Sequence, residues 1–271
     1  MKIIRVFPRK TKATPSDELV RFTTPSFFDE ADEIHISVTF SYDLKNAEQL
    51  YKDWQHVAPT KIGGVALGDK GAEFIPGKYL KKGYTITSRG CPNKCWFCDV
   101  WKREGNIREL EIKDGYNVLD SNLLACSDQH IKKVFEMLKQ QKEKSLFTGG
   151  LEAARLKDWH IEELLKIKPK RMFFAYDTKD DYEPLQIAGK NLINAGFTIA
   201  SHTLMCYVLI GYPKDTFVMA EKRLLEAMDI GFTPMAMLYR NKTGETKETW
   251  KKFQRLWARA GLIYARKQKF L

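Results

Sequence analysis

The chain has 271 residues, of which 44% are hydrophobic, enough for one sizeable core with an added subdomain or for two small domains. This composition excludes a disordered or fibrous protein. The formal net charge of +11 suits a nucleic acid or another anionic partner, and equally a solvated basic surface. The most apolar segment, residues 204–212, is too short to cross a bilayer, and no N-terminal stretch has the pattern of a secretory signal. We therefore expect a cytoplasmic protein with no membrane partner.

Residues 1–80 are predicted to form a small α/β subdomain. Residues 34–38 have a strand pattern, Ala47, Leu50 and Trp54 mark one face of a helix, and residues 61–67 return as a second strand. One strand, one helix and one strand make a crossover of a doubly wound, Rossmann-like sheet. The glycine pair 63–64 would serve a tight turn as readily as a ligand.

Residues 81–240 alternate between strand and helix patterns. The clearest helix spans residues 128–142, and Gly196 and Gly231 each stand where a helix would end before an apolar run. The strand candidates are residues 84–87, 116–119, 145–148, 171–176, 203–210 and 234–239. Six strands are too few for a closed eight-stranded barrel. The predicted fold class is therefore α/β, an open partial (β/α)6 barrel preceded by a small Rossmann-like βαβ subdomain.

Residues 241–271 are predicted to form a basic, aromatic, helical extension. Their rings and cations would suit stacking against a single-stranded nucleic acid. Read as a helix, the same segment would pack Phe253, Leu256 and Trp257 on the barrel, and we favour that interpretation. The aromatic and basic residues in question are Trp250, Phe253, Trp257, Arg259, Tyr264 and Arg266.

Three of the five cysteines lie within eight residues, directly after a predicted strand. The segment Cys91-Pro92-Asn93-Lys94-Cys95-Trp96-Phe97-Cys98 has the spacing C-x3-C-x2-C. Three thiolates can bind three irons of a cubane cluster and leave the fourth iron open to another ligand. The alternative is structural zinc, which takes four ligands, and the next candidates are Cys126 and His130. Cys126 and Cys206 stand among apolar residues, as small buried side chains do.

This motif, with the preceding string Ile86-Thr87-Ser88-Arg89-Gly90, resembles the signature of radical S-adenosylmethionine (SAM) enzymes, in the branch that includes cobalamin-dependent members and methylthiotransferases. The resemblance, which covers residues 84–240, implies that Cys91, Cys95 and Cys98 hold one 4Fe-4S cluster. It also implies that SAM chelates the open iron, and that an electron from a reductant such as flavodoxin or ferredoxin splits SAM into methionine and a 5′-deoxyadenosyl radical. Phe97 would lie against the adenine. The sequence contains no Asp-x-His-x-x-Gly motif, so cobalamin is not expected.

The resemblance implies further SAM contacts at the ends of later strands. Residues 209–216 resemble the motif of the fifth strand, in which Ile210, Gly211 and Pro213 would pack on the adenine. After the second strand, Asp120 and Asn122 would hold the SAM amino group. Glu152, after the third strand, would lie near the methionine or the substrate, and Asp177 would end the fourth strand near SAM. Each of these polar residues would serve a turn or a helix cap as readily, and Asp215 would be the N-cap of the next helix.

The sequence thus favours a radical SAM enzyme that abstracts hydrogen from a substrate, with RNA or another anionic molecule among the candidates. Methyl transfer and sulfur-group transfer are among its possible outcomes. One alternative is a zinc-stapled nucleic-acid-binding module without enzymatic activity, and another is a cluster-bearing electron carrier with a fourth cysteine ligand. Neither alternative has a use for the alternating strands and helices or for the turn at residues 211–213.

Overall fold

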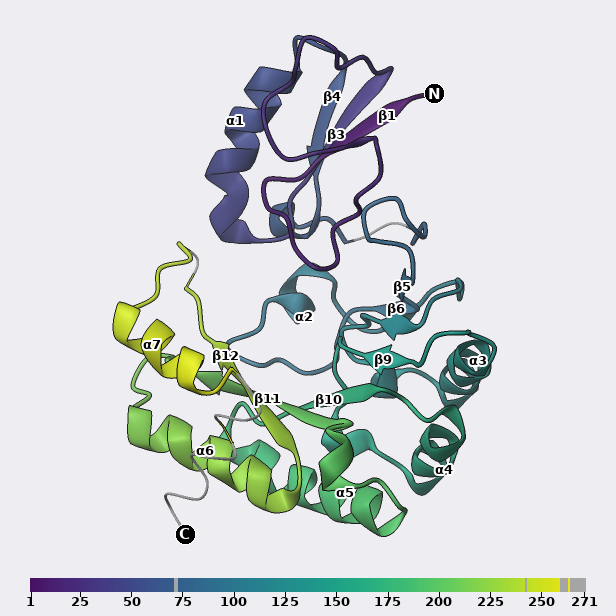
Figure 1. Cartoon of the computed structure of the whole chain (residues 1–271), viewed down its shortest axis with the longest axis vertical. Helices are drawn as coiled ribbons and strands as arrows, with labels where there is room; N and C mark the ends of the chain where they lie inside the picture. The colour runs from purple at the N-terminus through teal and green to yellow at the C-terminus, as the bar shows by residue number, and fades with distance from the viewer. Residues whose placement is uncertain (71–72, 242, 259–262, 264–271) are drawn as a thin grey trace.

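The apolar residues of the chain form two separate hydrophobic cores, one for each of two parallel sheets (Figure 1). The structure is a computed structural model that describes residues 1–70, 73–241, 243–258 and 263. It is a mixed α/β fold whose two larger sheets contain parallel strands, as the sequence predicted at that level. Within the described ranges, no helix combines the length and the apolar character needed to cross a membrane.

The N-terminal sheet has four parallel strands in the order β2-β1-β3-β4. The strands are β1 (Ile3–Val6), β2 (Val20–Arg21), β3 (Glu33–Ser37) and β4 (Thr60–Gly63). Helix α1 (Leu44–Trp54) connects β3 to β4 and buries Ala47, Leu50 and Trp54, so the predicted crossover is confirmed. At Gly64, a Cβ would lie 2.6 Å from the carbonyl oxygen of Val38, so a close backbone approach explains the second glycine of the pair.

The larger sheet contains all six predicted strands, and they lie side by side in chain order. They are β5 (Tyr84–Thr85), β8 (Asn117–Val118), β9 (Leu146–Phe147), β10 (Arg171–Ala175), β11 (Leu204–Ile210) and β12 (Thr233–Leu238). Every neighbouring pair is parallel. A short antiparallel pair, β6 (Ser88–Arg89) with β7 (Arg108–Glu109), lies beside this sheet and was not predicted. It joins the two ends of the segment that contains the three clustered cysteines.

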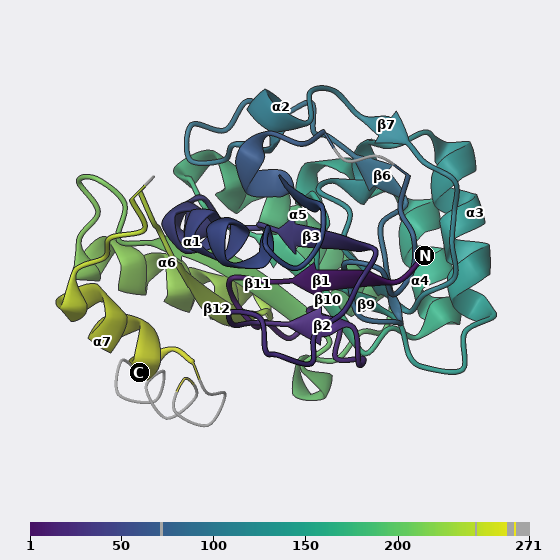
Figure 2. The same ribbon diagram turned by 90° about the horizontal axis from the view of Figure 1, so that it is seen from above.

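Helices cover one face of the larger sheet, and the N-terminal sheet lies over its other side (Figures 1 and 2). Strand β11 shows the two faces, because Cys206, Val208 and Ile210 are buried while the alternate residues Tyr207 and Leu209 are partly exposed. The helices that follow the sheet strands are α3 (Asp128–Lys139), α4 (Asp158–Ile167), α5 (Tyr182–Asn194), α6 (Phe217–Ile230) and α7 (Glu248–Leu256). The short helix α2 (Val100–Arg103) lies on the side of the N-terminal sheet (Figure 1). The predicted helix 128–142 is confirmed as α3, which ends three residues earlier.

Helix α7 packs on the core of the larger sheet. Phe253 and Trp257 are buried in that core, as the packing interpretation of the C-terminal segment predicted, and Trp250 is buried there as well. Leu256 is 43% exposed, so its predicted packing is wrong, since α7 turns that position outward. Arg259, Tyr264 and Arg266, which were considered for stacking on a nucleic acid, lie outside the described residues.

Candidate functional site

The loop that carries the three cysteines is closed at its base by backbone and side-chain hydrogen bonds. The Cys91 amide donates to the Gly105 carbonyl at 3.1 Å, next to the β6–β7 pair. The carboxylate of Glu104 is buried and accepts the Gly90 amide at 2.9 Å. Glu104 therefore anchors the start of the loop. Sequence reasoning missed this residue, because nothing local distinguishes it from other acidic residues.

The three cysteines are half-buried free thiols near one another. The Cys98 amide donates to the Cys95 carbonyl at 3.2 Å, and the Trp101 indole donates to the same carbonyl at 3.1 Å. Burial, followed by the neighbouring Cys98 and Cys91, raises the pKa of Cys95 to about 11. Burial also raises the pKa of Cys98. Cys95 and Cys98 therefore need a nearby cationic group to become thiolates.

Thiolates can hold either a single metal ion or an iron-sulfur cluster. In the part of the chain that the structure describes, no three His, Cys, Asp or Glu side chains converge closely enough to hold one metal ion. A zinc ion binds sulfur at about 2.3 Å, so its ligands must crowd around a point. A cubane cluster is larger and holds its three cysteine sulfurs further apart. Three thiolates on one loop could hold three irons of a cubane cluster.

The two residues considered as a fourth zinc ligand face other partners. The His130 Nε2 lies 3.3 Å from the Thr87 hydroxyl, and its Nδ1 lies 3.8 Å from Glu109. Cys126 is buried, and its thiol is hydrogen-bonded to Ser88. Both side chains thus lie against residues in or next to strands β6 and β7.

The loops after β8 and β9 meet beside Cys91. Gly149 makes this possible, because a Cβ there would lie 2.2 Å from the Asp120 carbonyl oxygen. The Asn122 side-chain nitrogen donates to Glu152 at 2.5 Å and lies 3.5 Å from the Cys91 sulfur. The Asn122 side-chain oxygen is buried and, among the described residues, has no hydrogen-bond partner. The loops after β8 and β9 therefore contribute to one site.

Asp120 has a different role in the structure from Asn122. Its side chain is almost fully buried, and its carboxylate accepts hydrogen bonds from the Thr87 amide, the Thr87 hydroxyl and the Ser88 hydroxyl, each at 2.6 Å. These bonds fix the end of the strand that leads into the cysteine loop. Both Asp120 oxygens are engaged in these bonds, so this geometry gives Asp120 a positioning role. Glu152 is paired as well, because the oxygen that accepts Asn122 also lies 2.7 Å from the Arg155 side chain.

Asp177 follows β10 and lies on the cysteine side of the sheet. Its carboxylate accepts the Leu209 amide at 3.1 Å. Burial, followed by the neighbouring Asp181, raises the pKa of Asp177 to about 7. Both carboxylates also contribute to the raised pKa of Cys95, which places them near the cysteine loop. The structure thus brings Asp177 toward the three thiols, as its position at a strand end predicted.

The turn at residues 211–213 is held by a buried ion pair. The Asp215 carboxylate accepts the Gly211 amide at 2.8 Å and pairs with Arg223 at 3.0 Å. The N-cap of α6 is Thr216, so the prediction of Asp215 as that cap is wrong, because Asp215 turns back toward Gly211. Pro213 is exposed at the turn.

The side chain of Ile210 faces the helix layer and is fully buried, so only its backbone is available to a ligand on the other side. Its neighbour Leu209 faces the open side of the sheet. The sequence analysis did not say which of these two side chains faces the open side of the sheet, although the alternation of buried and exposed positions along a strand could have shown it.

Aromatic side chains surround the cysteine loop. The Trp96 ring meets Phe97, Tyr212 and Tyr239 with ring centroids 5.3, 5.5 and 6.0 Å apart. Trp96 is nevertheless 54% exposed. Phe97 therefore lies within an aromatic group at the open side of the site. Tyr212 and Tyr239 were missed, because only the fold brings the ends of β11 and β12 to the loop.

The chain matches no protein-family model, and no curated protein matches it. Its function must therefore be argued from the side chains around Cys91.

Proposed function

We propose that the protein is a radical SAM enzyme in which Cys91, Cys95 and Cys98 hold one 4Fe-4S cluster. The observation that carries the proposal is a loop with three half-buried thiols, where Asn122 lies beside Cys91 and is hydrogen-bonded to Glu152. Asn122 and Glu152 come from the ends of the next two strands in the sheet. In this proposal the six-stranded sheet is an open partial (β/α)6 barrel, and the N-terminal sheet is a Rossmann-like subdomain.

When bound, the cluster would supply one electron, taken from a reductant such as flavodoxin or ferredoxin, that cleaves SAM into methionine and a 5′-deoxyadenosyl radical. The radical would take a hydrogen atom from the substrate, with 5′-deoxyadenosine and a substrate radical as the products. The protein's own side chains bind and orient SAM and exclude water from these species.

Asn122 and Glu152 would receive the SAM amino group. The free Asn122 oxygen can accept a hydrogen bond from an ammonium group, and the Glu152 carboxylate, which also pairs with Arg155 at 2.7 Å, supplies a second acceptor beside it. Asp120 supports this arrangement indirectly by fixing residues 87–88. The two residues next to Cys91 are thus suited to a cationic amine.

The opposite side of the site would receive the adenine. Phe97 and the backbone of Ile210, Gly211 and Pro213 supply flat or apolar surface there, and the Asp215–Arg223 pair holds the turn. Asp177 fixes the Leu209 amide, so the end of β11 is rigid where the ring would pack. Preorganised contacts of this kind lower the ordering cost of binding.

The proposal is tested by anaerobic reconstitution with iron and sulfide, reduction with dithionite in the presence of SAM, and detection of 5′-deoxyadenosine by mass spectrometry. The native protein and Cys126→Ala are expected to form it, because Cys126 is buried and is not one of the three loop cysteines. Cys95→Ala is expected to form none. Absence of cluster absorbance, with stoichiometric zinc bound instead, would favour the zinc-stapled binding module.

A further inference from the structure

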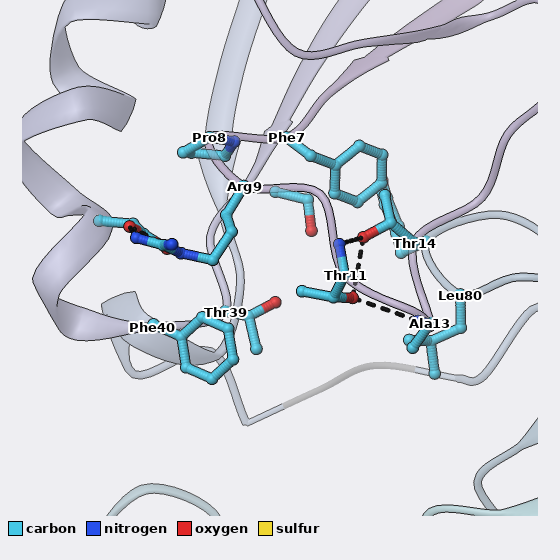
Figure 3. Close-up of a pocket in the computed structure, with 12 residues that line it drawn as sticks. Phe7, Pro8, Arg9, Thr11, Ala13, Thr14, Thr39, Phe40 and Leu80 are labelled. Atoms are coloured by element: carbon cyan, nitrogen blue, oxygen red, sulfur yellow. Dashed lines mark hydrogen bonds and ion pairs between the residues drawn. The ribbon is translucent and has the colours of Figure 1, made fainter. Parts of the chain in front are cut away.

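The N-terminal sheet has a ligand-binding topology. In the order β2-β1-β3-β4, the connection after β1 leads to β2 on one side of β1, and the connection after β2 leads to β3 on the other side. The connections therefore diverge between β1 and β3. Parallel sheets bind ligands at the carboxyl ends of strands that flank such a switch point. A cavity of about 30 Å³ lies there, between the segments that follow β1 and β3 (Figure 3). Arg9, Thr11, Thr14 and Thr39 line it.

A larger cleft of about 560 Å³ continues from this cavity and shares Thr39 and Phe40 with it. It extends from the N-terminal sheet to helix α2, which follows Cys98, and to the residues that follow β12. Its volume lies within the range of small-molecule sites, about 300–1,000 Å³. A ligand held by the N-terminal sheet would therefore reach the segment next to the cysteine loop.

The cleft has more positive than negative side chains, although Arg103 lies 3.9 Å from the Glu104 carboxylate. Four basic side chains line it, and the acidic side chain beside them, Asp99, is paired with Lys102 at 3.0 Å. Among the residues that the structure describes, Lys70 and Arg240 form no ion pair with a carboxylate. The four cations are Lys70, Lys102, Arg103 and Arg240. This excess of positive charge suits phosphate groups.

Flat aromatic surfaces alternate with these cations. The Phe40 and Tyr42 rings are stacked, with centroids 5.1 Å apart and planes at 8°. The Arg240 guanidinium lies 4.9 Å from the centroid of the Tyr42 ring. Next to Arg240 in the chain, Tyr239 contacts Trp96 of the cysteine loop. Rings and cations thus follow one another from the N-terminal sheet to the loop, which is the pattern that binds single-stranded nucleic acids.

We propose that this cleft binds a nucleoside phosphate unit of the substrate, and that the N-terminal sheet holds the substrate against the cysteine loop. The inference rests on the proposed function and names the substrate class of the same site. Because the rings and cations extend from Tyr42 to Trp96 and do not gather at one point, the unit belongs to a single strand and not to a free nucleotide.

The test measures binding to the reconstituted full-length protein without SAM or reductant. The probe is a fluorescein-labelled oligoadenylate of about twelve nucleotides, within the usual site sizes for single strands, followed by fluorescence anisotropy at several salt concentrations. Adenosine 5′-monophosphate is the competitor that distinguishes a site for a single strand from a site for a free nucleotide. It is expected to displace the strand weakly, whereas displacement at a concentration equal to that of the strand would assign the cleft to free nucleotides.

The variant Lys70→Gln/Arg240→Gln removes two exposed cations from the cleft. It is expected to weaken binding and to reduce the slope of log K against log salt by about 1.4, since each phosphate contact on a single strand contributes about 0.7. The matched control is Arg171→Gln/Lys190→Gln, which removes two exposed cations elsewhere. Equal losses in the two double variants, or no binding of either probe, would overturn the inference.

A second variant tests the stacking surface. Tyr42→Leu is expected to weaken binding of the strand about tenfold, because stacking of one base contributes about 1–3 kcal/mol. Tyr42→Phe keeps the ring and is expected to bind as the native protein does. Binding of the strand without 5′-deoxyadenosine formation would contradict the proposed function alone. Formation of 5′-deoxyadenosine without binding would contradict the inference alone.

Discussion

Asn122 donates a hydrogen bond of 2.5 Å to Glu152 and thereby joins the loops after β8 and β9 beside the Cys91 sulfur. The bond turns the Asn122 nitrogen toward a carboxylate and leaves its buried oxygen as an acceptor. An acceptor oxygen next to a carboxylate is a receptor for a protonated amine, because it supplies both a hydrogen bond and the opposite charge.

Glu152→Gln is therefore expected to weaken SAM binding about tenfold or more, since it replaces a charge-assisted hydrogen bond with a neutral one. The cluster content should stay unchanged, because Glu152 is not a predicted cluster ligand. Equilibrium dialysis of SAM against the reconstituted protein measures the affinity, and iron analysis measures the cluster.

The control for this change is Glu162→Gln, which removes an exposed carboxylate from α4. It should bind SAM as the native protein does. If Glu152→Gln also bound SAM with native affinity, the amino group would have to be held elsewhere.

The strands of the larger sheet could be predicted because each is a short apolar run between turn signals, and two of them follow a glycine at the end of a helix. Strands β1 and β2 were missed. The four residues of β1 and the two of β2 are too few to show a period, and they are strands because they pair with each other and with β3.

The roles of the polar residues in the site were also beyond prediction from the sequence. The sequence identified Asp120, Asn122 and Glu152 as candidates, because they follow strands. It could not assign their roles, because the Thr87 hydroxyl that engages Asp120 and the Asn122 amide that reaches Glu152 are both about 30 residues away in the chain. Glu104 and the β6–β7 pair were missed for the same reason, since pairing across a loop leaves no local pattern.

Gly149→Ala is expected to destabilise the protein by about 1–3 kcal/mol, the usual cost of overpacking a close contact. The added Cβ would lie 2.2 Å from the Asp120 carbonyl oxygen and 2.6 Å from the Leu119 carbonyl carbon, and both are backbone atoms that cannot rotate away. Urea unfolding followed by circular dichroism measures the change. The same variant should weaken SAM binding, because it separates Glu152 from Asn122.

Gly63→Ala is the matched substitution, since a Cβ at Gly63 would have no atom within 4 Å. Its stability should stay within about 0.5 kcal/mol of native. A Gly149→Ala protein as stable as Gly63→Ala would mean that the loops after β8 and β9 do not pack as closely as described.

His160 makes the stability of the protein depend on pH. It is fully buried in α4, and its Nδ1 accepts the Lys157 amide at 3.0 Å. Burial lowers the pKa of His160 to about 4, compared with about 6.5 for a free histidine. Between these values the unfolded chain binds a proton that the folded protein does not, so the free energy of unfolding falls as pH falls.

This contribution is fully present above about pH 6.5 and is lost progressively down to about pH 4, for a total of about 3 kcal/mol. The native protein should therefore lose about 2 kcal/mol more stability between pH 7 and pH 5 than His160→Leu, in which no group titrates at that position. Urea unfolding of both proteins at the two pH values measures this difference, and the contribution of every other titrating group cancels in the comparison. If the two proteins lost stability in parallel as pH falls, His160 would be protonated in the folded protein without a cost in free energy. That result would contradict the effect assigned here to its burial in α4.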